Sequence, residues 1–127
     1  MGRRPSPTPS NVSYASETVP AVARTLVTTY AQALQPLNMI AQSAVGETRW
    51  DAVAAAVVAL RSARESMSTV ERRLLGLAVL SGGPIGEIAA LMGIAPSTLS
   101  AQLVGTDAQL LGQALSRDVA GQWVIEQ

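Results

Sequence analysis

The stretch that most constrains the fold of this chain is IGEIAALMGIAPSTLSAQL, at residues 85–103. Gly93 can adopt the positive φ that ends a helix and turns the chain. Four residues earlier, Ala89 is small enough to let a following helix cross close to it. The pattern therefore predicts a first helix over residues 85–92. Its buried face is expected to comprise Ile88, Ala89 and Met92.

A second helix is expected over residues 96–104. Pro96 suits the first turn of a helix, because its missing N–H would have no partner there. Leu99 and Leu103 are four residues apart, so they share one side of this helix and are expected to be buried. The residues left on the outward side are Ser97, Ser100, Ala101 and Val104.

This apolar pattern resembles the helix-turn-helix of bacterial transcription regulators. The longer run from Val70 to Leu111 is similar to the four-helix version found in sigma-factor region four and in response-regulator output domains. The resemblance implies a sequence-specific regulator, repressor-like and possibly phage- or plasmid-encoded. It also implies that the second helix enters the major groove of double-stranded DNA.

On this interpretation the helix over residues 96–104 reads DNA with uncharged side chains. Hydroxyl and amide groups can bond to base edges or phosphates, and small apolar groups can touch a thymine methyl. Phosphate contacts must come mainly from arginines elsewhere, because Glu87 is the only charged residue between positions 85 and 106. The candidate DNA-binding residues are Pro96, Ser97, Thr98, Ser100, Ala101, Gln102, Val104, Arg72, Arg73, Arg3 and Arg4.

The predicted fold class is all-α, a multi-helix bundle with the helix-turn-helix in its C-terminal half. Apolar spacing predicts further helices over residues 17–34, 37–46, 48–60, 68–80 and 106–115. Pro36 is expected to separate the first two helices. Capping boxes at Ser68–Glu71 and Thr106–Gln109 are expected to open the last two.

Four segments follow from these assignments. They are a disordered arm at residues 1–16, a helical layer at 17–66, the helix-turn-helix domain at 67–120 and a tail at 121–127. The arm is rich in Pro, Ser and Thr; it either solubilises the terminus or lays Arg3 and Arg4 along DNA. The tail, with its apolar Trp123, is expected to be a short strand or an extended segment docked on a neighbour.

The layer at residues 17–66 carries no recognisable motif. It is apolar on most sides between Val53 and Leu60, which indicates burial in the domain centre or at a subunit interface. We expect a homodimer, because one uncharged reading helix would bind weakly and two half-sites would bind better. A small hydrophobic ligand among its Ala and Val side chains is an alternative.

Composition limits the function further. The chain has no His and no Cys, so most metal sites and nucleophile–base pairs are excluded, and we expect neither an enzyme nor a cofactor. Nine basic and nine acidic residues give a net charge of zero, which is unusual for a DNA-binding protein. An alternative is therefore a protein–protein interaction module that docks RNA polymerase or another regulator without binding DNA.

Two further expectations concern location and the internal arginines. No secretory signal is evident, and the longest apolar run, Ala52–Leu60, is too short to span a membrane, so we expect a cytoplasmic protein. The arginines of residues 61–73 either contact phosphate or form a solvated helix face with Glu65 and Glu71.

Overall fold

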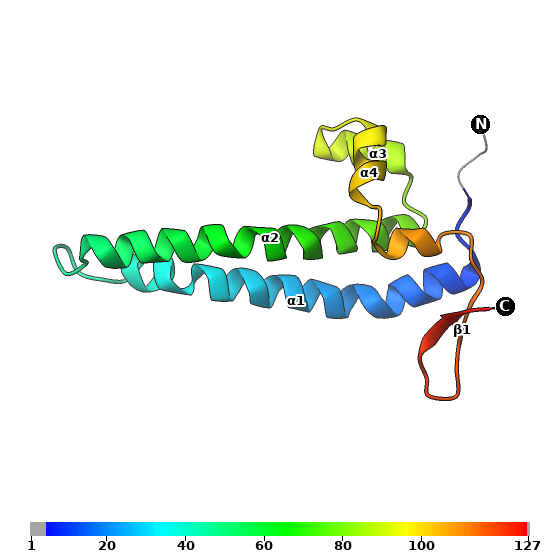
Figure 1. Ribbon diagram of the computed structural model, residues 1–127, viewed down its shortest axis with the longest axis horizontal. Coiled ribbons are helices and arrows are strands. Elements are labelled where there is room, and N and C mark those ends of the chain that lie inside the picture. The colour runs from blue at the N-terminus through cyan, green and yellow to red at the C-terminus, as the bar shows by residue number, and fades with distance from the viewer. Residues whose placement is uncertain (1–4, 127) are drawn as a thin grey trace. The chain divides into compact units, whose positions relative to one another are not determined.

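The computed structural model describes residues 5–126 of the chain. Most of these residues are α-helical, as predicted, and they include a small two-stranded sheet (Figure 1). The elements in order are α1 (Pro9–Ala41), α2 (Trp50–Leu80), α3 (Ile85–Met92), α4 (Pro96–Gln102), the 3-10 helix η1 (Asp107–Leu110), β1 (Leu115–Arg117) and β2 (Trp123–Ile125).

The chain divides into two compact units, and both long helices contribute to each. Residues 23–71 form the hairpin unit, and residues 1–22 together with 72–127 form the terminal unit. The predicted boundary between residues 66 and 67 falls inside the continuous helix α2, whereas the two units divide after residue 71. Residues 5–22 group with the C-terminal half of the chain.

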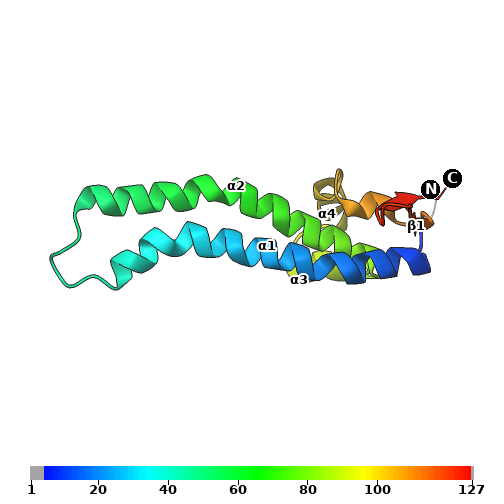
Figure 2. The ribbon, with the colours of Figure 1, turned by 90° about the horizontal axis from the view of Figure 1, so that it is seen from below.

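In the hairpin unit, α1 and α2 run antiparallel and side by side (Figures 1 and 2). Their buried and half-buried residues recur every three or four positions and form what we call the inner seam. On α1 these residues are Leu26, Thr29, Ala33, Pro36 and Ile40, and on α2 they are Ala56, Leu60, Ala63, Met67 and Val70. This spacing is typical of two helices that pack along a common line.

The predicted break at Pro36 is wrong, because α1 continues through this residue to Ala41. A proline inside a helix removes one backbone hydrogen bond and crowds the preceding turn. Pro36 is half-buried on the inner seam, so packing against α2 offsets this cost.

The predicted start of a helix at Ser68 is also wrong, because α2 is one helix where two were expected. The inner seam passes through Met67 and Val70 without a change of register. Thr69 satisfies its hydroxyl inside the helix by donating to the Glu65 carbonyl (3.0 Å). Glu71, the expected capping residue, instead accepts a hydrogen bond from the hydroxyl of Tyr30.

The expected disordered arm is helical from Pro9 onward. Thr8 and Asn11 cap the start of α1 reciprocally: the Thr8 hydroxyl accepts from the Asn11 N–H (3.1 Å), and the Asn11 side-chain oxygen accepts from the Thr8 N–H (3.0 Å). Asn11 is fully buried, and its amide donates to the carbonyls of Leu110 (3.1 Å) and Gln113 (2.9 Å). Polar residues that suggested disorder therefore anchor the helix.

The helix predicted over residues 106–115 is wrong, although Thr106 caps the start of the shorter helix that replaces it. The Thr106 hydroxyl accepts a hydrogen bond from the Ala108 N–H (3.3 Å) and opens the four-residue η1. Gly112 has a φ of +83°, so the chain turns away, and Leu115 begins β1 instead of ending a helix.

The expected strand in the C-terminal tail is confirmed as β2. It pairs antiparallel with β1, which the sequence did not predict, and Leu115 lies opposite Ile125 and Arg117 opposite Trp123. This pairing adds a small sheet to the predicted all-α class. Across residues 5–126, none of the helices has the length and apolar character needed to cross a membrane.

Candidate nucleic-acid interface

The two short helices predicted around Gly93 are present as α3 and α4. Gly93 has a φ of 72°, the left-handed conformation expected of it, and its N–H donates to the Ala90 carbonyl (3.2 Å). Pro96 occupies the start of α4, as predicted, and this helix ends at Gln102, two residues before the expected end.

A buried cluster joins these helices to the last turn of α2. Its members are Val79, Ile85, Ala89, Leu99 and Leu103. Ala89 and Leu99 have no exposed surface, which fits the close crossing expected at the small residue. Ile88 is only half-buried. The expected burial of Met92 is wrong: its side chain is exposed, because Met92 ends α3 next to the turn and lies outside the cluster.

The outward side of α4 is uncharged and accessible. Its exposed residues are Pro96, Ser97, Thr98, Ala101 and Gln102. Val104 is exposed as predicted, but it follows the helix. Ser100 differs from the expectation: it is half-buried and lines a small hollow of about 150 Å³ that also contacts Ile85 and Ala108.

Arg73, predicted to hold phosphate, is paired within the protein. Its guanidinium donates to both carboxylate oxygens of Asp107 (3.2 and 3.4 Å), and the Tyr14 hydroxyl donates to the same carboxylate (2.5 Å). The hydrogen bond to Asp107 raises the pKa of Arg73, and burial followed by the Asp107 hydrogen bond raises the pKa of Tyr14. Phosphate would have to compete with Asp107 for this arginine.

The other predicted phosphate-binding arginines are spread over the chain. Arg72 is exposed beside Arg73 at the start of the terminal-unit part of α2. Arg3 and Arg4 lie outside the described residues. Of the four predicted phosphate-binding arginines, the structure therefore describes Arg72 and Arg73, which both lie in the terminal unit.

A second charged cluster in the terminal unit was not predicted. The Glu17 carboxylate accepts from the Arg117 guanidinium and from the Trp123 indole N–H (3.2 Å). Arg117 lies 4.8 Å from the centre of the Trp123 ring, and the Tyr14 ring meets that ring edge-on at 5.8 Å. Glu17 is about a hundred residues away in sequence from both Arg117 and Trp123. In the sequence, only the apolar Trp123 in the tail suggested that this region packs against another part of the protein.

Gly76 is a further residue whose role the sequence did not reveal. A Cβ atom placed on it would lie 2.5 Å from the Thr106 hydroxyl oxygen and 3.3 Å from the Ala108 nitrogen. The missing side chain allows η1 to approach α2 closely, and this contact fixes the segment that follows α4.

Comparison of the chain with known protein families, with curated proteins and with solved structures found no match. Within residues 5–126, no group of acidic side chains is arranged to hold a metal ion.

Proposed function

We propose that the protein is a cytoplasmic, sequence-specific DNA-binding regulator of the repressor type, and that α3, Gly93 and α4 act as a helix-turn-helix. One observation carries the proposal. Leu99 holds α4 in the buried cluster while Ser97, Thr98, Ala101 and Gln102 remain exposed on one short helix. Small uncharged groups of this kind suit contact with base edges in the major groove.

The charge distribution predicts how such binding would depend on salt. Arg73 is paired with Asp107, so this ion pair would have to open for Arg73 to contact phosphate. Even with contacts from all four predicted arginines (Arg3, Arg4, Arg72 and Arg73), the slope in a plot of log affinity against log salt concentration would be no steeper than about −4 for each bound chain. This is a shallow dependence, so base contacts must supply much of the specificity.

The direct test is selection of bound fragments from random double-stranded DNA by the purified full-length protein. A recovered consensus site is then titrated with the double variant Ser97→Ala/Thr98→Ala and with Ser13→Ala, an exposed serine of α1. We expect at least about tenfold weaker specific binding for the double variant only. Unchanged binding would exclude α4 as the reading element, and recovery of no site at low salt would refute DNA binding.

A second candidate function is a protein–protein interaction module that docks RNA polymerase or another regulator. Leu91 on α3 is 89% exposed and Val104 is 73% exposed, and no charged residue lies between positions 88 and 106. Such apolar surface suits a protein partner. On this alternative, Leu91→Ser reduces binding to purified RNA polymerase, and DNA selection recovers nothing.

A further inference from the structure

The hairpin unit has a very small core for its length. Across residues 23–71 the buried side chains are Ala33, Ala56 and Met67, and two of these are alanines. Long helices in water gain most of their stability from packing an apolar face, which this unit provides only in part. Its exposed large hydrophobic residues are Val27, Tyr30, Leu34, Met39, Val45, Trp50, Val53, Val57 and Val58.

Many of these exposed residues form a second seam beside the inner seam. On α1 it comprises Val27, Tyr30, Leu34, Leu37 and Ala41, each one position after an inner-seam residue. One position corresponds to a rotation of about 100° around a helix. On α2 the outer seam comprises Trp50, Val53 and Val57, followed by Arg61, Arg64, Ser68 and Glu71. We call these residues together the outer seam.

The two halves of the outer seam lie on the same side of the hairpin. Both are rotated in the same sense from the inner seam, and in antiparallel neighbours such rotations lead to one common side. A hydrogen bond supports this placement, because the hydroxyl of Tyr30 on α1 donates to the carboxylate of Glu71 on α2. The hairpin unit therefore presents one face that is apolar along α1 and along the first part of α2.

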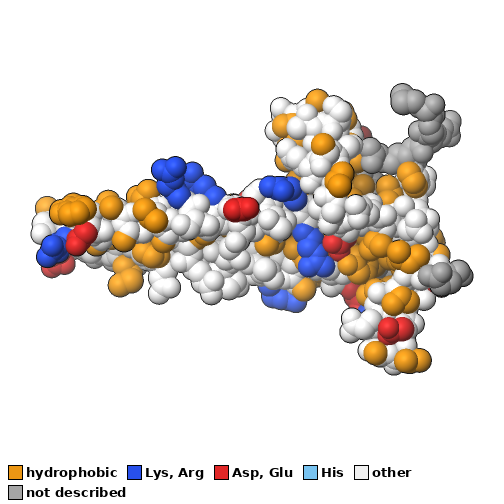
Figure 3. Space-filling model, viewed as in Figure 1, with side chains coloured by type: hydrophobic (Ala, Val, Ile, Leu, Met, Phe, Trp, Pro, Cys, Tyr) orange, Lys and Arg blue, Asp and Glu red, His pale blue; other side chains and the backbone are white. Residues whose placement is uncertain are grey.

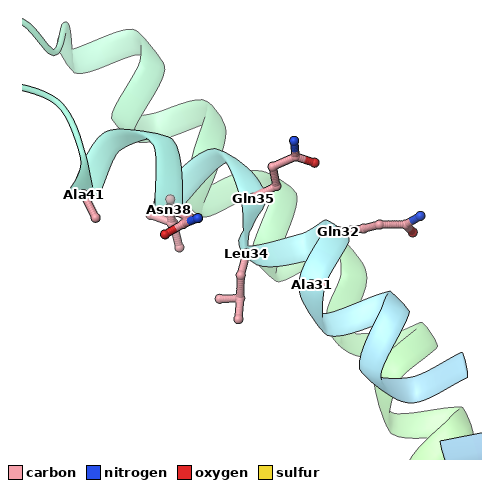
Figure 4. Close-up of a pocket in the computed structure, with 7 residues that line it drawn as sticks. Ala31, Gln32, Leu34, Gln35, Asn38 and Ala41 are labelled. Carbon is pink, nitrogen blue, oxygen red and sulfur yellow. The ribbon is translucent and has the colours of Figure 1, made fainter. Parts of the chain in front are cut away.

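This face is hollowed along α1. An open hollow of about 690 Å³ is lined by Ala31, Gln32, Leu34, Gln35, Leu37, Asn38 and Ala41. Figure 4 shows Leu34 pointing away from Gln32 and Gln35, and Figure 3 shows hydrophobic side chains around the α1–α2 turn at the left. A hollow of this kind can receive side chains from a facing helix.

We propose that the outer seam packs against the outer seam of a second copy of this chain, so that two hairpins form a four-helix bundle. In such a bundle every helix packs against two neighbours and therefore needs two adjacent apolar seams, which α1 and the first part of α2 have.

The charges of the hairpin unit favour a second copy as the occupant. Residues 23–71 contain four arginines and four acidic residues, and no charged residue lies between Arg24 and Glu47. Because these charges sum to zero, two copies of the hairpin unit can meet without net electrostatic repulsion. A nucleic acid or an anionic membrane would find no net positive charge there to attract it.

The experiment compares two adjacent valines of α2 in the full-length protein without DNA. Val57 belongs to the outer seam and is 43% exposed, whereas Val58 lies outside it and is 60% exposed. Sedimentation equilibrium should give wild-type protein a mass of twice 13.2 kDa. Val57→Glu should raise the dimer dissociation constant at least about 100-fold, because a carboxylate would enter the apolar interface, whereas Val58→Glu should leave it unchanged.

A second pair of variants tests the proposal even if Val57→Glu does not fold. Alanine is the best helix former, so Val57→Ala and Val58→Ala should keep the helices while only the first weakens the dimer, by about tenfold. A monomeric wild type would overturn the proposal, as would equal effects at the two positions. Since no DNA is present, neither outcome bears on the reading of DNA by α4.

Discussion

Truncating Asn11 should test how the start of α1 is tied to the rest of the terminal unit. Its buried side chain makes four hydrogen bonds: it accepts from the N–H groups of Thr8 (3.0 Å) and Gly112 (2.9 Å) and donates to the carbonyls of Leu110 (3.1 Å) and Gln113 (2.9 Å). A buried hydrogen bond contributes about 1 kcal/mol, and an orphaned buried partner costs about 1–3 kcal/mol. We therefore expect Asn11→Ala to lower the unfolding free energy by about 3–5 kcal/mol.

The assay needs a probe that reports on the terminal unit alone. Trp123 lies in this unit and Trp50 in the hairpin unit, so urea unfolding is followed by tryptophan fluorescence with Trp50→Phe as the background. Ser13→Ala, at an exposed serine of the same helix α1, is the control and should change stability by less than about 0.5 kcal/mol. A loss below about 1 kcal/mol for Asn11→Ala would refute the tethering role.

Two further changes probe contacts around η1. Gly76→Ala should destabilise the protein by about 1–3 kcal/mol although alanine favours helix, because the new Cβ would lie 2.5 Å from the Thr106 hydroxyl oxygen; a higher melting temperature would contradict this. Tyr14→Phe should reduce stability only at lower pH. The pKa of Tyr14 is raised above 10.0, so its protonated hydroxyl stabilises the fold below that value, and this contribution is lost as pH rises through the folded-state pKa. Urea unfolding of the wild type and of Tyr14→Phe is measured at pH values below and above 10.0. A difference in unfolding free energy that does not change with pH would contradict this prediction.

The elements that could be predicted are those whose signals act over a few residues. Gly93 ends α3 through its own backbone, and Pro96 starts α4 through its own ring, so neither depends on distant partners. Leu99 was recognisable as buried from its spacing to Leu103. The position of the candidate interface therefore followed from local chemistry.

The errors arose where a distant partner outweighs a local signal. Thr8 and Asn11 have a composition typical of disorder, yet Asn11 binds groups around position 110 that no local pattern reveals. Pro36 and Ser68 are ordinary break and start signals, but the inner seam continues through both regions. The pairing of Arg73 with Asp107, 34 positions away, likewise cannot be read from the local charge balance.

The two proposals together explain how a chain of zero net charge could still bind DNA specifically. A single chain offers few arginines for phosphate, so its affinity would be low, whereas a dimer doubles the phosphate and base contacts in one binding event. Dimerisation through the outer seam and binding through α4 would then be linked. Val57→Glu should weaken binding to a two-fold site without changing α4, and the same site should tighten the dimer by the same factor, because linkage is reciprocal.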